Sequence, residues 1–428
     1  MRAVTSTTDR SPVMPGRSAG FTLFEITLTM LVIVMVLGGV LALFTANQDL
    51  ARVQTHVANM QQSIRVAQYE MVRHVRMTGR GPLPQGALPN GRALAVANNV
   101  AANTHISSTD AGSPLVVEGT DVLTIRGVFN TPLYQFSPTA GVYSQDGVDG
   151  TLVITDRTPT GIPQNLRPIA DAIDMTVDES KPEALLVVSP LDDAIYAVLE
   201  FSAASSYTEA IVDGVTQVTQ VNIAFRITGG ERTTEYNTLM PNGAYPPNMQ
   251  TASFAGLLEE YRYYIREGRA IPGDPTSQLT PSLSRARMYP GSQVPYLESA
   301  ANYAADVAND IFDLQIALAI DTDGDAQILE NEPPDGDDDW LYNSASDDDT
   351  DTAKWVGTGT DPLRKLFYVR INTLARAARQ DRGFEAALLT NIEDKDYTVS
   401  PGDYHNQPDQ RAYRRRIIQS IVDTRNVP

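Results

Sequence analysis

The sequence predicts an α+β protein in which a long N-terminal helix, half membrane-spanning and half amphipathic, packs on an antiparallel β-sheet head with long insertions. Two observations lead to this prediction. An apolar run near the N-terminus continues into a stretch with a single apolar stripe, and from residue 115 onward short segments alternate apolar and polar residues. The 428 residues divide into a leader (1–20), an apolar helix (21–46), an amphipathic helix (47–80) and the head (81–428).

The apolar run contains only one charged residue, Glu25. A helix over residues 21–46 is about 39 Å long at about 1.5 Å per residue, which exceeds the roughly 30 Å of a bilayer core. A carboxylate in hydrocarbon costs at least about 2.5–3.5 kcal/mol on insertion scales and persists mainly where it has a partner. The run therefore predicts a transmembrane helix whose acid pairs with a cation. The alternative is a signal anchor whose Glu25 lies near the membrane interface.

The charges that flank this run predict its orientation. Arg2, Arg10 and Arg17 precede it, against the single acid Asp9, and no further lysine or arginine occurs before Arg52. Positive charge concentrates on the cytoplasmic side of membrane helices. We therefore expect a cytoplasmic N-terminus and an exported head.

The stretch after the membrane run predicts a continuation of the same helix. Residues 47–78 contain neither proline nor glycine, and Gly79, Gly81 and Pro82 mark the end. The apolar stripe recurs at three- and four-residue steps, at Val53, Val57, Met60, Ile64, Ala67, Met71 and Val75. We expect this stripe to pack inside the head of the same chain.

The head is predicted to be rich in strands. The alternating or apolar segments are 115–117, 121–128, 152–155, 185–189, 194–201, 215–227, 311–320, 365–374 and 413–422. The tyrosines at 261, 263 and 264 are expected on a half-buried strand, residues 83–112 as a loop, and 300–309 as a helix. Residues 375–412 are a charged connection without a clear structural pattern.

The segment 321–351 is strongly acidic, because 13 of its 31 residues are Asp or Glu and none is Lys or Arg. Its beginning has oxygen ligands at the spacing of a calcium-binding loop. The candidate calcium ligands are Asp321, Asp323, Asp325, the carbonyl of Gln327, and Glu332. Ala326 stands where such loops need glycine, and the preceding residues read as a strand instead of a helix. A solvated acidic loop without a metal remains the alternative.

The net charge, the residue composition and the absence of known catalytic motifs narrow the possible functions. A formal net charge of −19 argues against a nucleic-acid binder of the usual basic kind. The chain has no cysteine, so it has neither disulfides nor a thiolate site, and its four histidines have no metal-ligand spacing. No nucleotide-binding, zinc-protease or serine-nucleophile motif is present. We therefore expect a protein that is not an enzyme and has no cofactor other than the calcium considered above.

The segment Gly20-Phe21-Thr22-Leu23-Phe24-Glu25 resembles the signal of type IV pilins and pseudopilins. The resemblance implies cleavage between Gly20 and Phe21 by a prepilin peptidase and methylation of the Phe21 amine. It also implies that Glu25 docks the subunit by pairing with the Phe21 amine of a neighbour. Such a protein starts in the bacterial inner membrane and reaches the pilus at the cell surface.

Three segments of the second half, 307–325, 366–379 and 414–426, are similar to those of PilW-like minor pilins. This resemblance implies a role in pilus assembly and priming, a place at the pilus tip, and a contribution to twitching motility. The implied partners are other minor pilins, the major pilin and a tip adhesin. Two alternatives stay open: a J-type pseudopilin of type II secretion, and an adhesin or binding module carried on a pilin stem, with its ligand site in region 83–300.

Overall fold

The computed structural model describes residues 22–81, 83–85, 92–110, 112–137, 149–179, 181–192, 195–240, 243, 245–246, 249–269, 276, 279–296, 304–320, 328–329, 339–343, 366–381, 383–398 and 404–424. The chain divides into two compact units, Met1–Thr55 and His56–Pro428. The predicted α+β class, with one long apolar N-terminal helix and antiparallel sheets, is confirmed.

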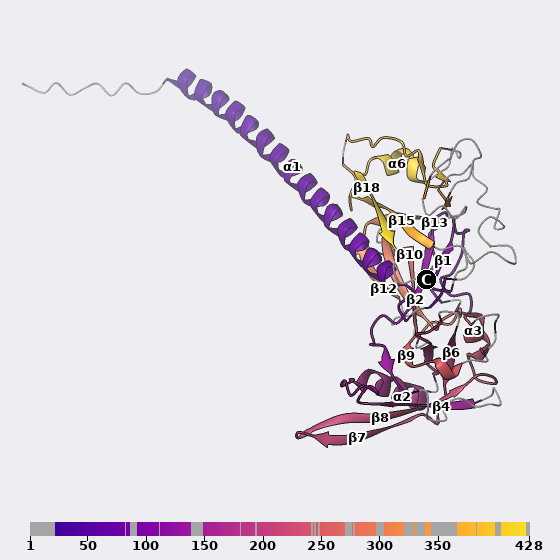
Figure 1. Cartoon of the computed structure of the whole chain (residues 1–428). Helices are drawn as coiled ribbons and strands as arrows, with labels where there is room; N and C mark the ends of the chain where they lie inside the picture. The colour runs from indigo at the N-terminus through magenta and orange to yellow at the C-terminus, as the bar shows by residue number, and fades with distance from the viewer. Residues whose placement is uncertain are drawn as a thin grey trace, which may run out of the picture. The chain divides into compact units, whose positions relative to one another are not determined.

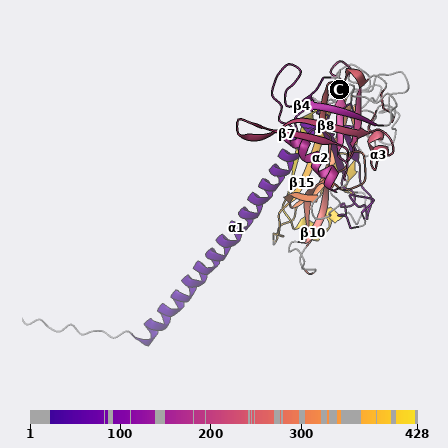
Figure 2. The ribbon, with the colours of Figure 1, turned by 90° about the horizontal axis from the view of Figure 1, so that it is seen from below.

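Helix α1 (Leu23–Met77) is a single element of 55 residues, and Figure 2 shows it as one unbroken ribbon. It continues because no proline interrupts it, although Gly38 and Gly39 lie within it. It ends where Gly79 adopts φ 73°, the left-handed conformation that glycine adopts without steric cost. By length and composition α1 can cross a membrane.

The first sheet has the strand order β1-β2-β10-β11-β12, and all of its pairings are antiparallel. Its strands are β1 (Leu94–Ala97), β2 (Val122–Gly127), β10 (Glu259–Arg269), β11 (Leu279–Met288) and β12 (Ala304–Asn309). The second sheet has the order β14-β13-β15-β18 and is also antiparallel. Its strands are β13 (Ile311–Ile320), β14 (Trp340–Leu341), β15 (Leu366–Arg376) and β18 (Arg415–Asp423). Figure 1 labels most of these strands.

One hydrophobic core joins the C-terminal part of α1 to both of these sheets. The helix contributes the predicted stripe from residue 60 onward, namely Met60, Ile64, Ala67, Met71 and Val75, which are all buried. The strands contribute alternating side chains such as Leu123, Ile316 and Ile371. The stripe is buried because its three- and four-residue spacing places all five side chains on one face of the helix.

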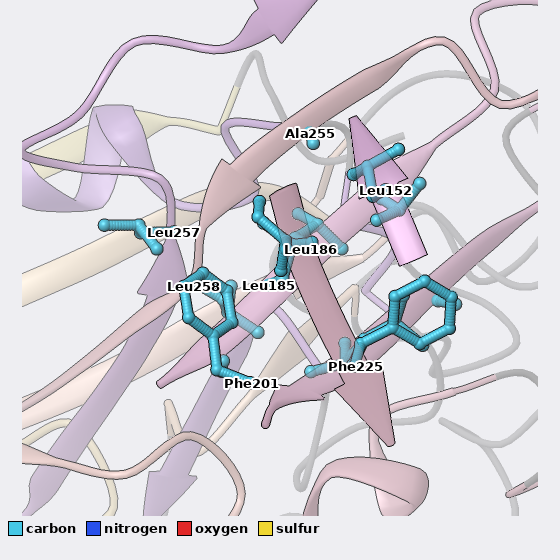
Figure 3. Packing of buried hydrophobic residues seen from close by; sticks show 14 of the residues in the cluster. Leu152, Leu185, Leu186, Phe201, Phe225, Ala255, Leu257 and Leu258 are labelled. Carbon is cyan, nitrogen blue, oxygen red and sulfur yellow. The ribbon is translucent and has the colours of Figure 1, made fainter. Parts of the chain in front are cut away.

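A third, seven-stranded sheet has its own core. Its path is β3-β9-β5-β6-β8-β4, and β7 pairs with β8 outside that path. The strands are β3 (Tyr134–Gln135), β4 (Asp149–Thr155), β5 (Ala184–Val188), β6 (Tyr196–Phe201), β7 (Ser206–Val212), β8 (Val215–Arg226) and β9 (Phe254–Leu257). Helices α2 (Arg167–Glu179) and α3 (Thr233–Thr238) contribute to this core. Figure 3 shows Leu185, Leu186 and Phe225 among its packed side chains.

Several expectations about the head require correction. Residues 304–309 form strand β12, so the expected helix over 300–309 is wrong. Pairing with β11 overrides the helical preference of the alanines there. Residues 94–97 form β1 within the expected loop. The charged connection holds β16 (Asn391–Ile392), β17 (Lys395–Asp396), η3 (Tyr404–Asn406) and α6 (Pro408–Arg411), and a short η2 (Met249–Thr251) precedes β9.

Candidate functional site

The first turn of α1 contains the acid that the sequence singles out. The Glu25 carboxylate oxygen Oε2 accepts hydrogen bonds from the Thr22 backbone N–H and from Thr22 Oγ1, both at 3.0 Å. The Glu25 backbone N–H in turn donates to Thr22 Oγ1 at 3.3 Å. This reciprocal pattern is a capping box, which satisfies N–H groups that a helix start would otherwise leave without a partner. Glu25 therefore has a role within its own helix.

The capping box leaves part of the acid available. Glu25 is solvent-exposed in the isolated chain, and its second oxygen, Oε1, has no hydrogen-bond partner among the residues that the structure describes. A cation from another molecule can therefore approach Oε1 while Oε2 remains bonded to Thr22. Capping and pairing with an external cation are compatible at this residue.

The apolar side chains that follow Glu25 are exposed in the part of the chain that the structure describes. From Leu23 to Phe44, the large hydrophobic side chains are 49–83% exposed. They lie on every face of the helix, because the apolar residues in this segment are consecutive. At about 25 cal/mol per Å² of apolar surface, leaving such a segment in water is strongly unfavourable. A membrane or other protein chains must cover it.

The predicted docking pair forms between two molecules, so the structure of one chain does not test it. Gly20 and Phe21 lie outside the described residues, so the predicted cleavage point and amine are not placed. Thr22 is the functional residue that the sequence reasoning missed. The pattern Thr-x-x-Glu at 22–25 is the sequence signature of a capping box and could have identified it.

The predicted calcium loop also lies outside the described residues. This applies to Asp321, Asp323, Asp325, Gln327 and Glu332, so the calcium site stays a prediction. Within the part of the chain that the structure describes, no group of three or more His, Cys, Asp or Glu residues is arranged to hold a metal ion.

The buried acids of the head are bound by other groups of the protein. Asp313, fully buried, accepts hydrogen bonds from Lys395 Nζ and Tyr397 OH, both at 2.7 Å, and from Gln315 Nε2 at 2.9 Å. These contacts join β13 to β17 and the residue after it. A buried acidic side chain with this many donors is a structural group, because both of its oxygens already have partners.

Glu260 on β10 is a second buried acid with strong partners. Its carboxylate contacts Arg126 Nε at 2.5 Å and Arg262 Nη2 at 2.8 Å, and it accepts the Gly291 N–H at 2.8 Å. Burial would raise the pKa of Glu260, but the two guanidinium groups outweigh burial and hold it below its usual value. Glu260 therefore stays ionised and ties β2 and β10 to the loop after β11.

A histidine and a tyrosine link α1 to the first sheet. The Tyr263 hydroxyl on β10 lies 2.5 Å from His74 Nδ1, and Glu70 Oε1 lies 3.3 Å from the same nitrogen. Arg285 on β11 binds Glu70 at 2.7 Å. Burial is the main reason that the pKa of His74 is lowered. The tyrosines of β10 lie in the core, as predicted, but the strand is not half-buried there: Tyr263 and Tyr264 point to opposite faces of the sheet and both are fully buried.

Comparison with protein-family models, curated proteins and solved structures gives no match to this chain.

Proposed function

We propose that the chain is a minor subunit of a type IV pilus system, acting in pilus assembly and priming and located at the pilus tip. The observation that carries the proposal is the exposed apolar half of a 55-residue helix that begins at Leu23, two residues after Phe21, and carries the lone acid Glu25 in its first turn. A transmembrane helix that later enters a filament needs apolar surface on every side, because lipid and then neighbouring helices cover it.

The proposed mechanism has two contacts. Cleavage after Gly20 creates an amine on Phe21, which is then methylated but keeps its positive charge. The amine of one subunit approaches Glu25 Oε1 of its neighbour, while Oε2 stays bonded to Thr22. In a medium of low dielectric constant this pairing removes most of the cost of the buried carboxylate. The apolar helices then pack side by side.

The state of the N-terminus tests the proposal directly. We expect mass spectrometry of the protein from its native membrane to find a chain that begins at Phe21 and carries one methyl group on its amine. The partner that performs this cleavage would be a prepilin peptidase. A native protein that still contains residues 1–20 would contradict the proposal.

Substitutions at the first turn separate docking from capping. Glu25→Gln removes the charge but keeps a side-chain oxygen for the capping box, whereas Glu25→Ala removes both. If Glu25 docks the subunit by its charge, both variants are processed normally and neither enters the filament. If Glu25 only caps the helix, Glu25→Gln enters the filament like the unchanged chain, and the docking role is wrong. Thr22→Val is the matched control, because it removes the Thr22 hydroxyl from the capping box and leaves the charge.

A deletion strain distinguishes pilus assembly from type II secretion. If the chain is a minor pilin, deletion abolishes surface pili and twitching motility and leaves exoprotein export unchanged. A J-type pseudopilin would give the opposite result. An adhesin on a pilin stem would leave pili in place and remove only attachment.

A further inference from the structure

Strand β18, which forms the end of the second sheet, has an open edge. It pairs with β15 over its whole length, from Arg376↔Arg415 to Tyr368↔Asp423. No strand of the described chain pairs with its other side. With nine residues it is long for an edge strand, and long edges are ready templates for another strand.

Two backbone hydrogen bonds show which way the groups of β18 point. The Thr424 N–H donates to the Phe367 carbonyl at 3.2 Å, and the Ala377 N–H donates to the Arg414 carbonyl at 2.8 Å. The residues of the segment 414–424 that make these two bonds, Arg414 and Thr424, both have even numbers. In an antiparallel pair, every second residue bonds to the neighbouring strand and the residues between point away. The odd-numbered residues of β18 therefore direct their N–H and C=O groups outward.

Three of these outward-facing residues form the open edge: Ile417, Gln419 and Ile421. Their backbone groups have no hydrogen-bond partner among the described residues. The side chains of Ile417 and Ile421 are 44% and 55% exposed, and Gln419 is exposed between them. Edge strands that face water usually carry charged residues or proline at such positions. Two isoleucines at alternate positions instead favour a partner that covers them.

The charges at the start of β18 indicate the chemistry of that partner. Arg414 pairs with Asp381 at 2.7 Å, and Arg415 donates to the His405 carbonyl. Arg416 is exposed and has no ion-pair partner within the described ranges. Three consecutive arginines in a chain of net charge −19 form a local basic site, and its accessible cation is Arg416.

We propose that β18 accepts an extended segment of a partner protein as an added antiparallel strand. The segment has aliphatic side chains at alternate positions that contact Ile417 and Ile421, and a carboxylate at its C-terminal end that pairs with Arg416. Antiparallel addition is favoured because the strands of this sheet all pair antiparallel, and it places the C-terminal end of the partner beside the start of β18. The inference does not depend on the chain's being a pilus subunit.

A designed peptide tests the edge directly. The probe has nine residues, with isoleucine or valine alternating with threonine and two glutamates at the C-terminal end, and the control is the same sequence in reverse order. Both are titrated by fluorescence anisotropy against the full chain in detergent micelles. We expect the first peptide to bind about fivefold more tightly than the second, because only the first places its carboxylates beside Arg416. Hydrogen exchange at the amides of Ile417, Gln419 and Ile421 should slow when it binds.

Two variants make the test specific. Gln419→Pro removes the central outward N–H without removing a bond to β15, so we expect it to weaken binding by at least about tenfold, whereas Gln419→Ala should bind like the unchanged chain. Thermal unfolding of each variant verifies the fold. If the proline variant does not fold, Arg416→Glu decides instead: it should reverse the preference in favour of a peptide that ends in two lysines.

Three results would overturn the inference. The first is that neither peptide binds to the unchanged chain. The second is that a folded Gln419→Pro variant, or Arg416→Glu where it is used, binds the acidic peptide as the unchanged chain does. The third is that the isolated chain is a dimer in micelles whose three edge amides are already protected, since the edge would then be an interface between two copies.

Discussion

The two halves of helix α1 have opposite environments within one continuous element. Ile33 in the first half is 49% exposed, whereas Ile64 in the second half is fully buried. The first half is apolar on every face, and the second half carries one apolar stripe that faces the strands of its own head. The difference teaches that one continuous helix can serve two environments: its second half packs in the interior of the head, whereas no described residue buries the apolar side chains of its first half.

Removal of the first half of α1 should have the largest effect, and the property that it changes is the solubility of the chain. A chain that begins at His56 keeps the buried stripe and loses all the apolar side chains from Leu23 to Phe44. We expect this truncated chain to be soluble without detergent and the full chain to require detergent, because only the full chain exposes a large apolar surface. Analytical ultracentrifugation of both chains measures this. Aggregation of a truncated chain with native circular dichroism would contradict the comparison.

A substitution in the buried stripe should have the next largest effect. Ile64→Ala removes a fully buried side chain from the core shared by α1 and two sheets, so we expect a loss of about 2–5 kcal/mol in the free energy of unfolding. The matched control is Ile33→Ala, which removes the same atoms from the first half. Denaturant unfolding of the head, followed by tryptophan fluorescence, should not detect the control substitution. Equal effects of the two substitutions would refute the contrast between the halves.

A polar contact in the second half of α1 should contribute less to the free energy of unfolding than the buried Ile64 side chain does. Gln68 Nε2 donates to Thr373 Oγ1 at 2.7 Å and to the Ile418 carbonyl at 3.1 Å, which ties α1 to β15 and β18. Gln68→Leu leaves these buried acceptors without this donor, so we expect a loss of about 1–3 kcal/mol. Gln62→Leu, on the exposed face of the same helix, should change stability by no more than about 0.5 kcal/mol. If the two leucine variants unfold alike, the contact across the sheet is not stabilising.

The sequence was sufficient to predict the elements with strong periodicity. The stripe of Ile64 and Met71 predicted the burial of one face of the second half of α1, and the apolar run at 311–320 predicted β13. Weaker local patterns failed. Helix α2 was missed although Ile169 and Ile173 stand four residues apart and are buried, and the alanines of β12 favoured a helix that pairing with β11 excludes. The separate core of the third sheet depends on contacts between distant segments, which no local pattern encodes.

For the candidate site, the sequence predicted that Glu25 is important but not that its partner within the same chain is Thr22. Glu25 stood out because it is the only charge in an apolar run, and that reasoning led to a partner on another molecule. The nearer partner is Thr22, three residues away, and the geometry of the first turn brings the two together. Local spacing therefore identifies the cap, whereas the docking partner depends on a second chain and has to be tested by experiment.

The smallest expected effect concerns the protonation of His74, whose imidazole lies in the buried half of α1. Burial lowers the pKa of His74 below its usual value of about 6.5, because the charged form is poorly solvated there. As the pH falls, His74 therefore binds a proton more readily in the unfolded chain than in the folded chain. The stability that neutral His74 contributes is fully present above about pH 6.5 and is lost as the pH falls from there through the lowered pKa.

Other buried groups also change how the stability of the chain depends on pH. The test therefore compares the unchanged chain with a variant that lacks His74. The pKa values of Asp121, Glu183 and Glu200 are raised mainly by burial, so these acids add stability as the pH falls. His74→Gln keeps an acceptor for the Tyr263 hydroxyl and cannot gain a proton. Between about pH 7.5 and about pH 5.5, we expect the unchanged chain to lose stability relative to this variant in denaturant unfolding. If the free energies of unfolding of the two chains change with pH in parallel, Glu70, which lies 3.3 Å from His74 Nδ1, compensates fully for the burial of the imidazole.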